Sequence, residues 1–266
     1  MTRALLLAVL VSAIPASAAA QVSVEVSPLR VELQAPAGST TTQAITLTNV
    51  GATGVRVRAT LSDWYLSRDG SPQFDEPLAG RPYAAAPWVK FAPPELVLAG
   101  NSTGTVRFTL AVPKTVDPAS YRTAILFDFT PVDGAGSDAA RQVRFKSRIA
   151  TLIYVNVGQV PPVLELTDMR VRATPEQTAV IATLKNSSRR SVRTKGTLVL
   201  YDAAGAAVRE VPVPDVPVLP ESERDVAVVA IEATRGLPQG RYRVEMRLDV
   251  GLPAMLIGET IVQVAR

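Results

Sequence analysis

Short apolar runs alternate with polar turns along almost the whole chain. The runs are rich in Val, Thr, Leu and Ile, and Gly, Pro, Asn or Asp interrupts them about every 8–12 residues, which is the spacing of strands in β-sandwiches. Helical periodicity hardly occurs. The pattern predicts strands at residues 23–34, 43–49, 55–65, 88–91, 95–98, 103–112, 121–130 and 143–157, and a second series at 163–173, 178–185, 192–202, 207–211, 224–232, 240–249 and 256–264.

The segment GQVPP, residues 158–162, separates the two series of strands. Its paired prolines fix the backbone dihedral φ and disfavour further strand pairing, so we expect a short, stiff linker. Each side holds about 100–140 residues, the size of one immunoglobulin-like domain. The sequence therefore predicts an all-β protein with two immunoglobulin-like β-sandwich domains in tandem, at residues 21–158 and 159–266.

The first stretch, MTRALLLAVLVSAIPASAAAQ, has the composition of a secretory signal peptide. One cation, Arg3, precedes an apolar run from Ala4 to Ile14, and small residues precede Gln21. We expect residues 1–20 to be removed and the protein to be secreted across the inner membrane, with the periplasm as its expected location. No later run of about 18 apolar residues predicts a membrane span.

The chain contains no cysteine and no histidine. Without disulfides the cores must hold by burial alone, and a hydrophobic fraction of 47% is sufficient for that. Without histidine the usual general base, the usual metal ligand and every Ser–His or Cys–His pair are excluded. The net charge of +4 is spread thinly, with no dense basic block among aromatic residues, so nucleic acid is not an expected partner. No cofactor is expected either.

The strand predicted at residues 143–157, VRFKSRIATLIYVNV, is unusually long and one-sided. Val143, Phe145 and Ile149 alternate with cations, as in a strand with one dry and one wet face. Fifteen residues at about 3.3 Å each would span roughly 50 Å, against about 5–6 residues for a typical strand. We expect this strand to project beyond its own sheet. The alternative is a core-facing strand that is fully paired inside its own sandwich.

Four stretches between about residues 22 and 157 resemble the periplasmic chaperones of fimbrial (pilus) assembly, the PapD-like family. They are VSPLRVEL, ITLTNVG…VRVRATLSDW, FAPPELVLAGNSTGTVRFTL and DPASYRTAILFDF, whereas the second half is similar only in its expected fold. The resemblance implies β-augmentation, in which the last strand of the first domain fills the open groove of a pilin-like subunit with an incomplete sandwich. It places Val143, Phe145 and Ile149 at the donor positions. The resemblance implies a protein subunit as a partner and allows an outer-membrane usher as a second partner. It implies no small-molecule cofactor.

The family also anchors the terminal carboxylate of the subunit with two cations, and this implies a role for Arg30. Arg30, in PLRVEL, falls at the first position, and a guanidinium offers a carboxylate a planar pair of donors. The second position falls on Ala150 or Thr151, and neither is cationic. Arg148, two residues from Ala150 and on the same face, is the expected substitute.

Two other functions fit the same composition. One is a non-catalytic structural or adhesive module of the cell envelope that uses the same surface. The other is a carboxylate-based glycan hydrolase on Asp63, Asp69, Asp75 and Glu76. No phosphate-binding loop, nucleophile elbow or metal-ligand cluster accompanies these acids, so we expect no enzyme. The basic stretch SSRRSVRTKG, residues 187–196, is expected to be a solvated turn, with an acidic partner or a membrane surface as the alternative.

Overall fold

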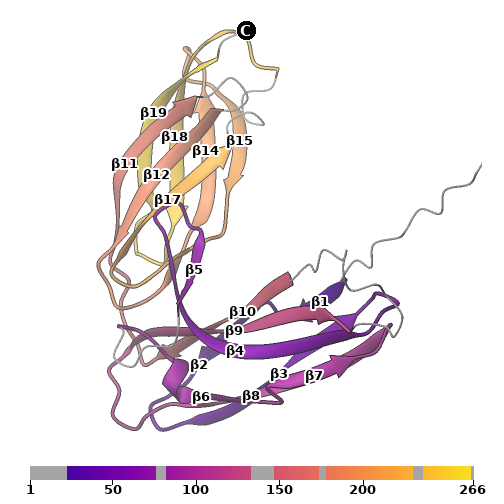
Figure 1. Ribbon diagram of the computed structural model, residues 1–266. Coiled ribbons are helices and arrows are strands. Elements are labelled where there is room, and N and C mark those ends of the chain that lie inside the picture. The colour runs from indigo at the N-terminus through magenta and orange to yellow at the C-terminus, as the bar shows by residue number, and fades with distance from the viewer. Residues whose placement is uncertain (1–22, 76–81, 133–146, 174–177, 230–235, 265–266) are drawn as a thin grey trace, which may run out of the picture.

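The computed structural model describes residues 23–75, 82–132, 147–173, 178–229 and 236–264. In these ranges the chain is almost entirely β-structure and forms two sandwiches that meet at a steep angle (Figure 1). This confirms the predicted all-β fold of two immunoglobulin-like sandwiches in tandem. The expected signal peptide lies outside the described residues, as do Val143 and Phe145. No helix in the described ranges is long and apolar enough to cross a membrane.

The N-terminal sandwich consists of two sheets. One sheet has the order β1-β3-β8-β6, and the other has the order β2-β10-β9-β4-β5, with β7 also paired to β4. A single turn of 3-10 helix, η1, precedes β6. The bounds are β1 Val24–Ser27, β2 Arg30–Gln34, β3 Thr40–Asn49, β4 Val55–Leu66, β5 Pro72–Asp75, η1 Ala86–Trp88, β6 Val89–Ala92, β7 Glu95–Leu98, β8 Ser102–Ala111, β9 Ala119–Pro131 and β10 Ser147–Val157.

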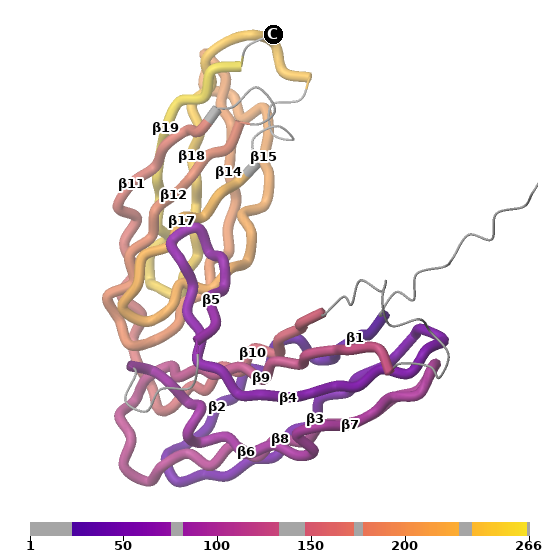
Figure 2. Tube along the Cα trace, viewed as in Figure 1, coloured from indigo at the N-terminus to yellow at the C-terminus, as the bar shows by residue number. Residues whose placement is uncertain are grey.

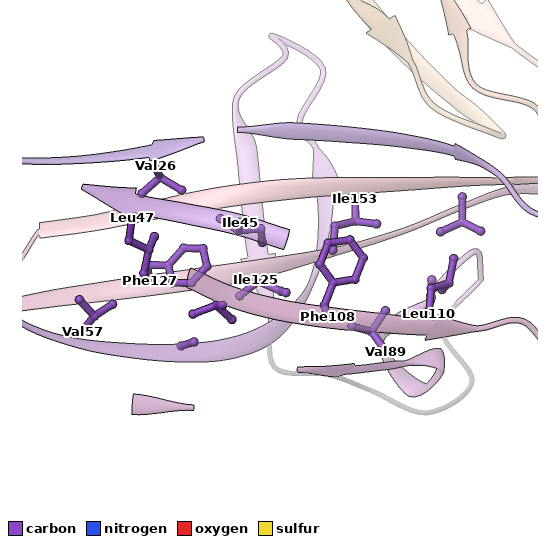
Figure 3. Close-up of a cluster of buried hydrophobic side chains, with 14 of the residues drawn as sticks. Val26, Ile45, Leu47, Val57, Val89, Phe108, Leu110, Ile125, Phe127 and Ile153 are labelled. Atoms are coloured by element: carbon purple, nitrogen blue, oxygen red, sulfur yellow. The ribbon is translucent and has the colours of Figure 1, made fainter. Parts of the chain in front are cut away.

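Alternating apolar side chains of both sheets fill the space between them (Figure 3). Phe108 of β8 faces Phe127 and Phe129 of β9 across this core, and all three are fully buried. Burial of each such side chain stabilises the fold by about 1.5–3 kcal/mol. The alternation of buried and more exposed side chains along β8 therefore determines which face of its sheet turns inward.

The C-terminal sandwich is built in the same way around a separate core. Its sheets have the orders β11-β12-β17 and β15-β14-β18-β19, and β13 pairs with β16 beside them. The bounds are β11 Leu164–Ala173, β12 Thr178–Asn186, β13 Val192–Arg193, β14 Lys195–Tyr201, β15 Ala207–Val213, β16 Pro217–Val218, β17 Ser222–Val229, β18 Gly240–Asp249 and β19 Leu256–Val264.

The two sandwiches share two stabilising devices although their sequences show no clear repeat. The hydroxyl of Tyr121 donates to the carbonyl of Asp117, and that of Tyr242 donates to the carbonyl of Pro238, both at 2.9 Å. These are tyrosine corners, a hallmark of immunoglobulin-like sandwiches. In addition, a buried asparagine ends one strand of each sandwich, Asn49 in β3 and Asn186 in β12, and its side-chain amide donates to three backbone carbonyls.

The first predicted strand, residues 23–34, is in fact two strands in different sheets. Val24–Ser27 pairs with β3 antiparallel, whereas Arg30–Gln34 pairs with β10 in parallel. Pro28 lies between them, and a proline has no N–H to donate to a sheet ladder. The chain therefore crosses from one sheet to the other at Pro28. The short strand β5, which pairs with the end of β4, was also not predicted.

The hairpin of β4 and β5 leaves the N-terminal sandwich and lies along β17 of the C-terminal one (Figure 2). At its turn the Arg68 carbonyl accepts from the Asp225 amide at 2.7 Å, and the Arg68 Nε lies 3.2 Å from the Asp225 carboxylate. Leu219 packs against Trp64 and Tyr154 at the same junction. These contacts hold the sheet of β10, β9 and β4 on the inner side of the angle.

Candidate functional site

The last strand of the N-terminal sandwich, β10, is paired unequally on its two sides. It pairs with β9 in antiparallel fashion along its whole length, from Ser147 to Val157. On its other side β2 pairs with it in parallel, but only from Leu152 to Asn156. Within the described residues no strand pairs with the Ser147–Thr151 part of β10 on that side.

Backbone contacts show which residues of β10 present polar groups to the open side. The Leu152 amide donates to the Leu29 carbonyl at 2.9 Å, and the Asn156 carbonyl accepts from the Ala35 amide at 3.0 Å. Even-numbered residues therefore direct N–H and C=O towards β2, and odd-numbered residues direct theirs towards β9. It follows that Ala150 presents both of its backbone groups at the part of the edge where β2 does not pair.

The side chains of β10 divide between two apolar environments. Ile153, Val155 and Val157 lie in the N-terminal core, and Ile149 is half-buried against the same core. Even-numbered side chains face the inner side of the angle, where Ala150, Leu152 and Tyr154 join a cluster with Trp64, Leu126 and Leu219. Of the three expected donor residues, only Ile149 is described, and it packs against its own sandwich.

Trp64 and Tyr154 form the centre of that second cluster. Their rings make an edge-to-face contact with centroids 5.2 Å apart, and the Trp64 Nε1–H donates to the Thr123 carbonyl at 2.9 Å. Burial raises the pKa of the Tyr154 phenol above its ordinary value, so this side chain is neutral at physiological pH. The cluster forms an apolar floor beside the open part of β10, because Ala150 and Leu152 pack against it.

Arg30 lies on this inner face, as expected for a residue in the cleft. It is the register partner of Leu152, so its side chain projects from the same face of the sheet as those of Leu152 and Tyr154. The side chain is 49% exposed, and its Nε lies 3.3 Å from the Glu32 carboxylate. Arg30 is therefore a solvent-accessible cation beside the apolar floor.

Arg148 is on the same face but is bound by a carboxylate. Its Nε and Nη2 donate to the two oxygens of Asp128 at 2.6 and 2.9 Å, a bidentate pair across β10 and β9. Arg148 lies four positions before Leu152, the residue opposite Arg30, which corresponds to roughly 13 Å along a strand. The structure therefore does not bring Arg30 and Arg148 together at one point.

Two of the four acidic residues of the alternative enzyme lie opposite each other, and the structure does not bring the whole set together. Asp63 and Asp75 are register partners across β4 and β5, whereas Asp69 lies in the hairpin turn and Glu76 lies outside the described residues. The Ser67 hydroxyl is the main cause that lowers the pKa of Asp69, so this carboxyl is held in its charged form by its own turn. Among the described residues no group of three or more acids could hold a metal ion.

Sequence reasoning did not connect Arg193 or Leu219 with this region. Arg193 was expected in a solvated turn, but it lies at the junction, 2.8 Å from Asp215 and 3.6 Å from Glu32. Only the packing of the two sandwiches brings these residues to the same place. The excess of arginine in SSRRSVRTKG was the sole sequence signal.

No protein-family model and no curated protein matches the chain. Its fold is similar to those of several solved fimbrial chaperones. The class 5 fimbriae chaperone CfaA has a TM-score of 0.45 and 11% identity, with 90% of this chain and 100% of that chain covered. A chain of the Salmonella enterica SafA pilin–SafB chaperone complex has a TM-score of 0.45 and 12% identity, with 92% and 97% covered.

A chain of the CsuC–CsuE chaperone–tip adhesion subunit complex of Acinetobacter baumannii has a TM-score of 0.43 and 16% identity. There the match covers 77% of this chain and 90% of that chain. Identities and TM-scores this low leave the function to be decided by the residues of this chain.

Proposed function

We propose that this protein is a periplasmic chaperone that binds fimbrial or related surface subunits by adding the open edge of β10 to their incomplete sandwiches. The observation that carries the proposal is the missing strand partner beside Ala150 in the described part of the chain. A sheet edge with unpaired backbone groups is a template for pairing with another chain. Leu29, which is 55% exposed next to this edge, adds apolar surface there.

The donor side chains in this proposal are Val143, Phe145 and Ile149. Burial of each in a subunit groove would contribute about 1.5–3 kcal/mol, and each backbone hydrogen bond about 0.5–1.5 kcal/mol, before the cost of ordering. Ile149 would need to exchange part of its packing against its own core for contacts with the subunit. The proposed domain limits, 21–158 and 159–266, fit the end of β10 at Val157 and the start of β11 at Leu164.

In the same proposal Arg30 binds the terminal carboxylate of the subunit, and Arg148 is the second cation. Arg30 is accessible, and its Nε lies 3.3 Å from the Glu32 carboxylate, which is longer than a charge-assisted hydrogen bond. Arg148 would first have to release Asp128. We therefore expect Arg30→Ala to weaken a subunit complex more than Arg148→Ala does. The protein carries out no catalysis in this scheme, and an outer-membrane usher would receive the complex.

Co-expression with a candidate pilin-like subunit tests the proposal. A tag on this chain should recover a one-to-one complex, and Phe145→Asp and Ile149→Asp should abolish it. Ile257→Asp is the matched control, because Ile257 is an exposed strand residue on β19 of the other sandwich, 57% exposed. Thermal unfolding of each variant shows whether the fold is intact. Binding of polymerised fibres without any binding of free subunit would favour the adhesive module instead.

A further inference from the structure

The hairpin of β4 and β5 is an arm of the N-terminal sandwich whose turn contacts β17 of the other sandwich (Figure 2). The Arg68 carbonyl accepts from the Asp225 N–H at 2.7 Å, and the Arg68 Nε donates to the Asp225 carboxylate at 3.2 Å. The Arg68 Nη1 also lies 3.6 Å from the Glu223 carboxylate. Arg68 therefore contacts both the backbone and the side chain of Asp225.

The contact at Arg68 is polar and open to solvent. The side chain of Arg68 is 57% exposed, and that of Glu223 is 45% exposed. Ion pairs that are this exposed contribute little to stability. The contact can therefore break and form again while both sandwiches stay folded.

Asp225 keeps its other partners when Arg68 leaves. The Thr183 hydroxyl donates to its carboxylate at 2.7 Å and the Arg170 Nη2 donates to it at 2.5 Å, and both residues belong to the C-terminal sandwich. Removal of one partner from an ion pair is costly where it leaves a charge uncompensated, and here it does not. The C-terminal side of the contact is thus preformed.

The turn of the hairpin is preformed as well. The Asp69 carboxylate accepts from the Ser67 hydroxyl at 2.5 Å and from the Ser71 N–H at 2.9 Å, and the Ser67 N–H donates to the Ser71 carbonyl at 3.0 Å. All three bonds lie within the turn, so the turn keeps its shape away from β17. Two preformed halves that meet through exposed contacts make an element with two discrete arrangements, in contact and apart.

Close packing at Gly70 determines how near the turn comes to β17. Gly70 has a φ of +87°, and a β-carbon there would lie within 3 Å of three guanidinium atoms of Arg224. That guanidinium is itself held, because its Nη1 donates to the Pro217 carbonyl at 2.5 Å. A side chain at residue 70 would therefore keep the turn away from β17.

The hairpin contact is separate from the contacts beside the linker. Arg68 lies four residues beyond Trp64, roughly 13 Å along a strand. Near the end of β10, the N–H of Ser120 donates to the Arg189 carbonyl of the C-terminal sandwich at 2.8 Å, and Gly158 begins the linker with a φ of +65°. Two attachments at different places fix an angle, whereas the attachment beside the linker alone leaves a hinge.

We propose that the β4–β5 hairpin is a reversible latch that fixes the angle between the two sandwiches. In the closed state Arg68 is bound to Asp225. In the open state this contact is broken, the sandwiches turn about the linker, and Leu219 leaves Trp64, its neighbour in the apolar cluster on the inner side of the angle. The latch does not depend on the proposed chaperone function.

Electron-spin distance measurements on the full chain test the latch. The chain has no cysteine, so spin labels at Thr105→Cys and Gln263→Cys, one exposed residue on each sandwich, report a single distance. The labelled chain without further changes should give one narrow distribution. Arg68→Gln and Gly70→Ala should each add a second distance, because each opens the latch.

Two control variants make matched changes away from the latch. Asp168→Asn removes an ion pair with Arg170 inside the C-terminal sandwich, and Gly205→Ala places a β-carbon at a φ of +82° where nothing lies within 4 Å. Both should leave the distance distribution unchanged. An unchanged distribution in Arg68→Gln and Gly70→Ala, or the same second distance in the controls, would overturn the proposal.

Amide hydrogen exchange measures the latch independently of the labels. The Asp225 N–H points at Arg68, whereas the Val226 N–H points at β12, where Ala182 is its register partner. In Arg68→Gln the Asp225 amide should exchange about two- to tenfold faster, the factor for loss of one hydrogen bond, and the Val226 amide should keep its wild-type rate. Equal exchange of the Asp225 amide in wild type and Arg68→Gln would contradict the latch.

Discussion

Proline substitutions along β10 test whether its edge beside Ala150 is open. Even-numbered residues of β10 direct their N–H groups away from β9, as the Leu152 contact with Leu29 shows. Ala150→Pro therefore removes an N–H for which the described chain offers no strand partner. Ile149→Pro removes an N–H that points at Phe127, its register partner in β9. The two adjacent substitutions should have opposite consequences.

The expected magnitudes follow from these partners. Ala150→Pro breaks no hydrogen bond of the ladder, so the free energy of unfolding should change by less than about 1 kcal/mol. Ile149→Pro leaves a buried carbonyl of β9 unsatisfied, at about 1–3 kcal/mol, and also loses the packing of a half-buried isoleucine. Together these losses should lower the free energy of unfolding by about 2–4 kcal/mol.

Urea denaturation followed by tryptophan fluorescence measures both values, because Trp64 lies beside β10. Amide hydrogen exchange provides the parallel test, since the Ala150 amide should exchange much faster than those of Ile149 and Leu152. Binding of a strand-deficient subunit should be lost in Ala150→Pro although its fold is intact. Equal destabilisation by the two prolines, or a protected Ala150 amide, would refute the open edge.

Three further changes test the junction and the cores. Asp225→Asn should lower the free energy of unfolding by about 1.5–3 kcal/mol at pH 7, because Thr183, Arg68 and Arg170 all donate to this carboxylate. Burial acts to raise the pKa of Asp225, but these hydrogen bonds outweigh it and hold the pKa below its ordinary value. The stabilisation by the Asp225 carboxylate is thus complete above about pH 4 and is lost as the pH falls through the folded-state pKa. The melting temperatures of wild type and variant should therefore converge in acid. Asn186→Ala leaves three backbone carbonyls without their side-chain donor, so the free energy of unfolding of the C-terminal sandwich should fall by at least about 2 kcal/mol. In calorimetry this sandwich should unfold at a lower temperature, while the transition of the N-terminal sandwich stays where it is in the wild type. Phe127→Ala should cost about 3–5 kcal/mol in urea, and a loss below 1 kcal/mol would contradict the core described here.

Local pattern was sufficient for most strands because alternation is a property of neighbouring residues. The run from Thr103 to Leu110 shows it, since its apolar positions point to one face wherever the strand lies. The same reasoning failed at Pro28. The pattern predicted one continuous strand at residues 23–34, but the structure has two strands in opposite sheets. Only their pairing with β3 and β10 shows this division.

The sequence by itself determined the class of the protein, two β-sandwiches without cysteine or histidine chemistry, and the one-sided apolar pattern of the strand that ends at Val157. Only the tertiary structure decided what lies beside that strand and which charges meet. Arg148 is bound by Asp128, and Arg193 approaches Glu32 from the other sandwich. The physical reason is that pairing register and domain contacts depend on residues far apart in the chain, whereas alternation records only the two faces of each strand.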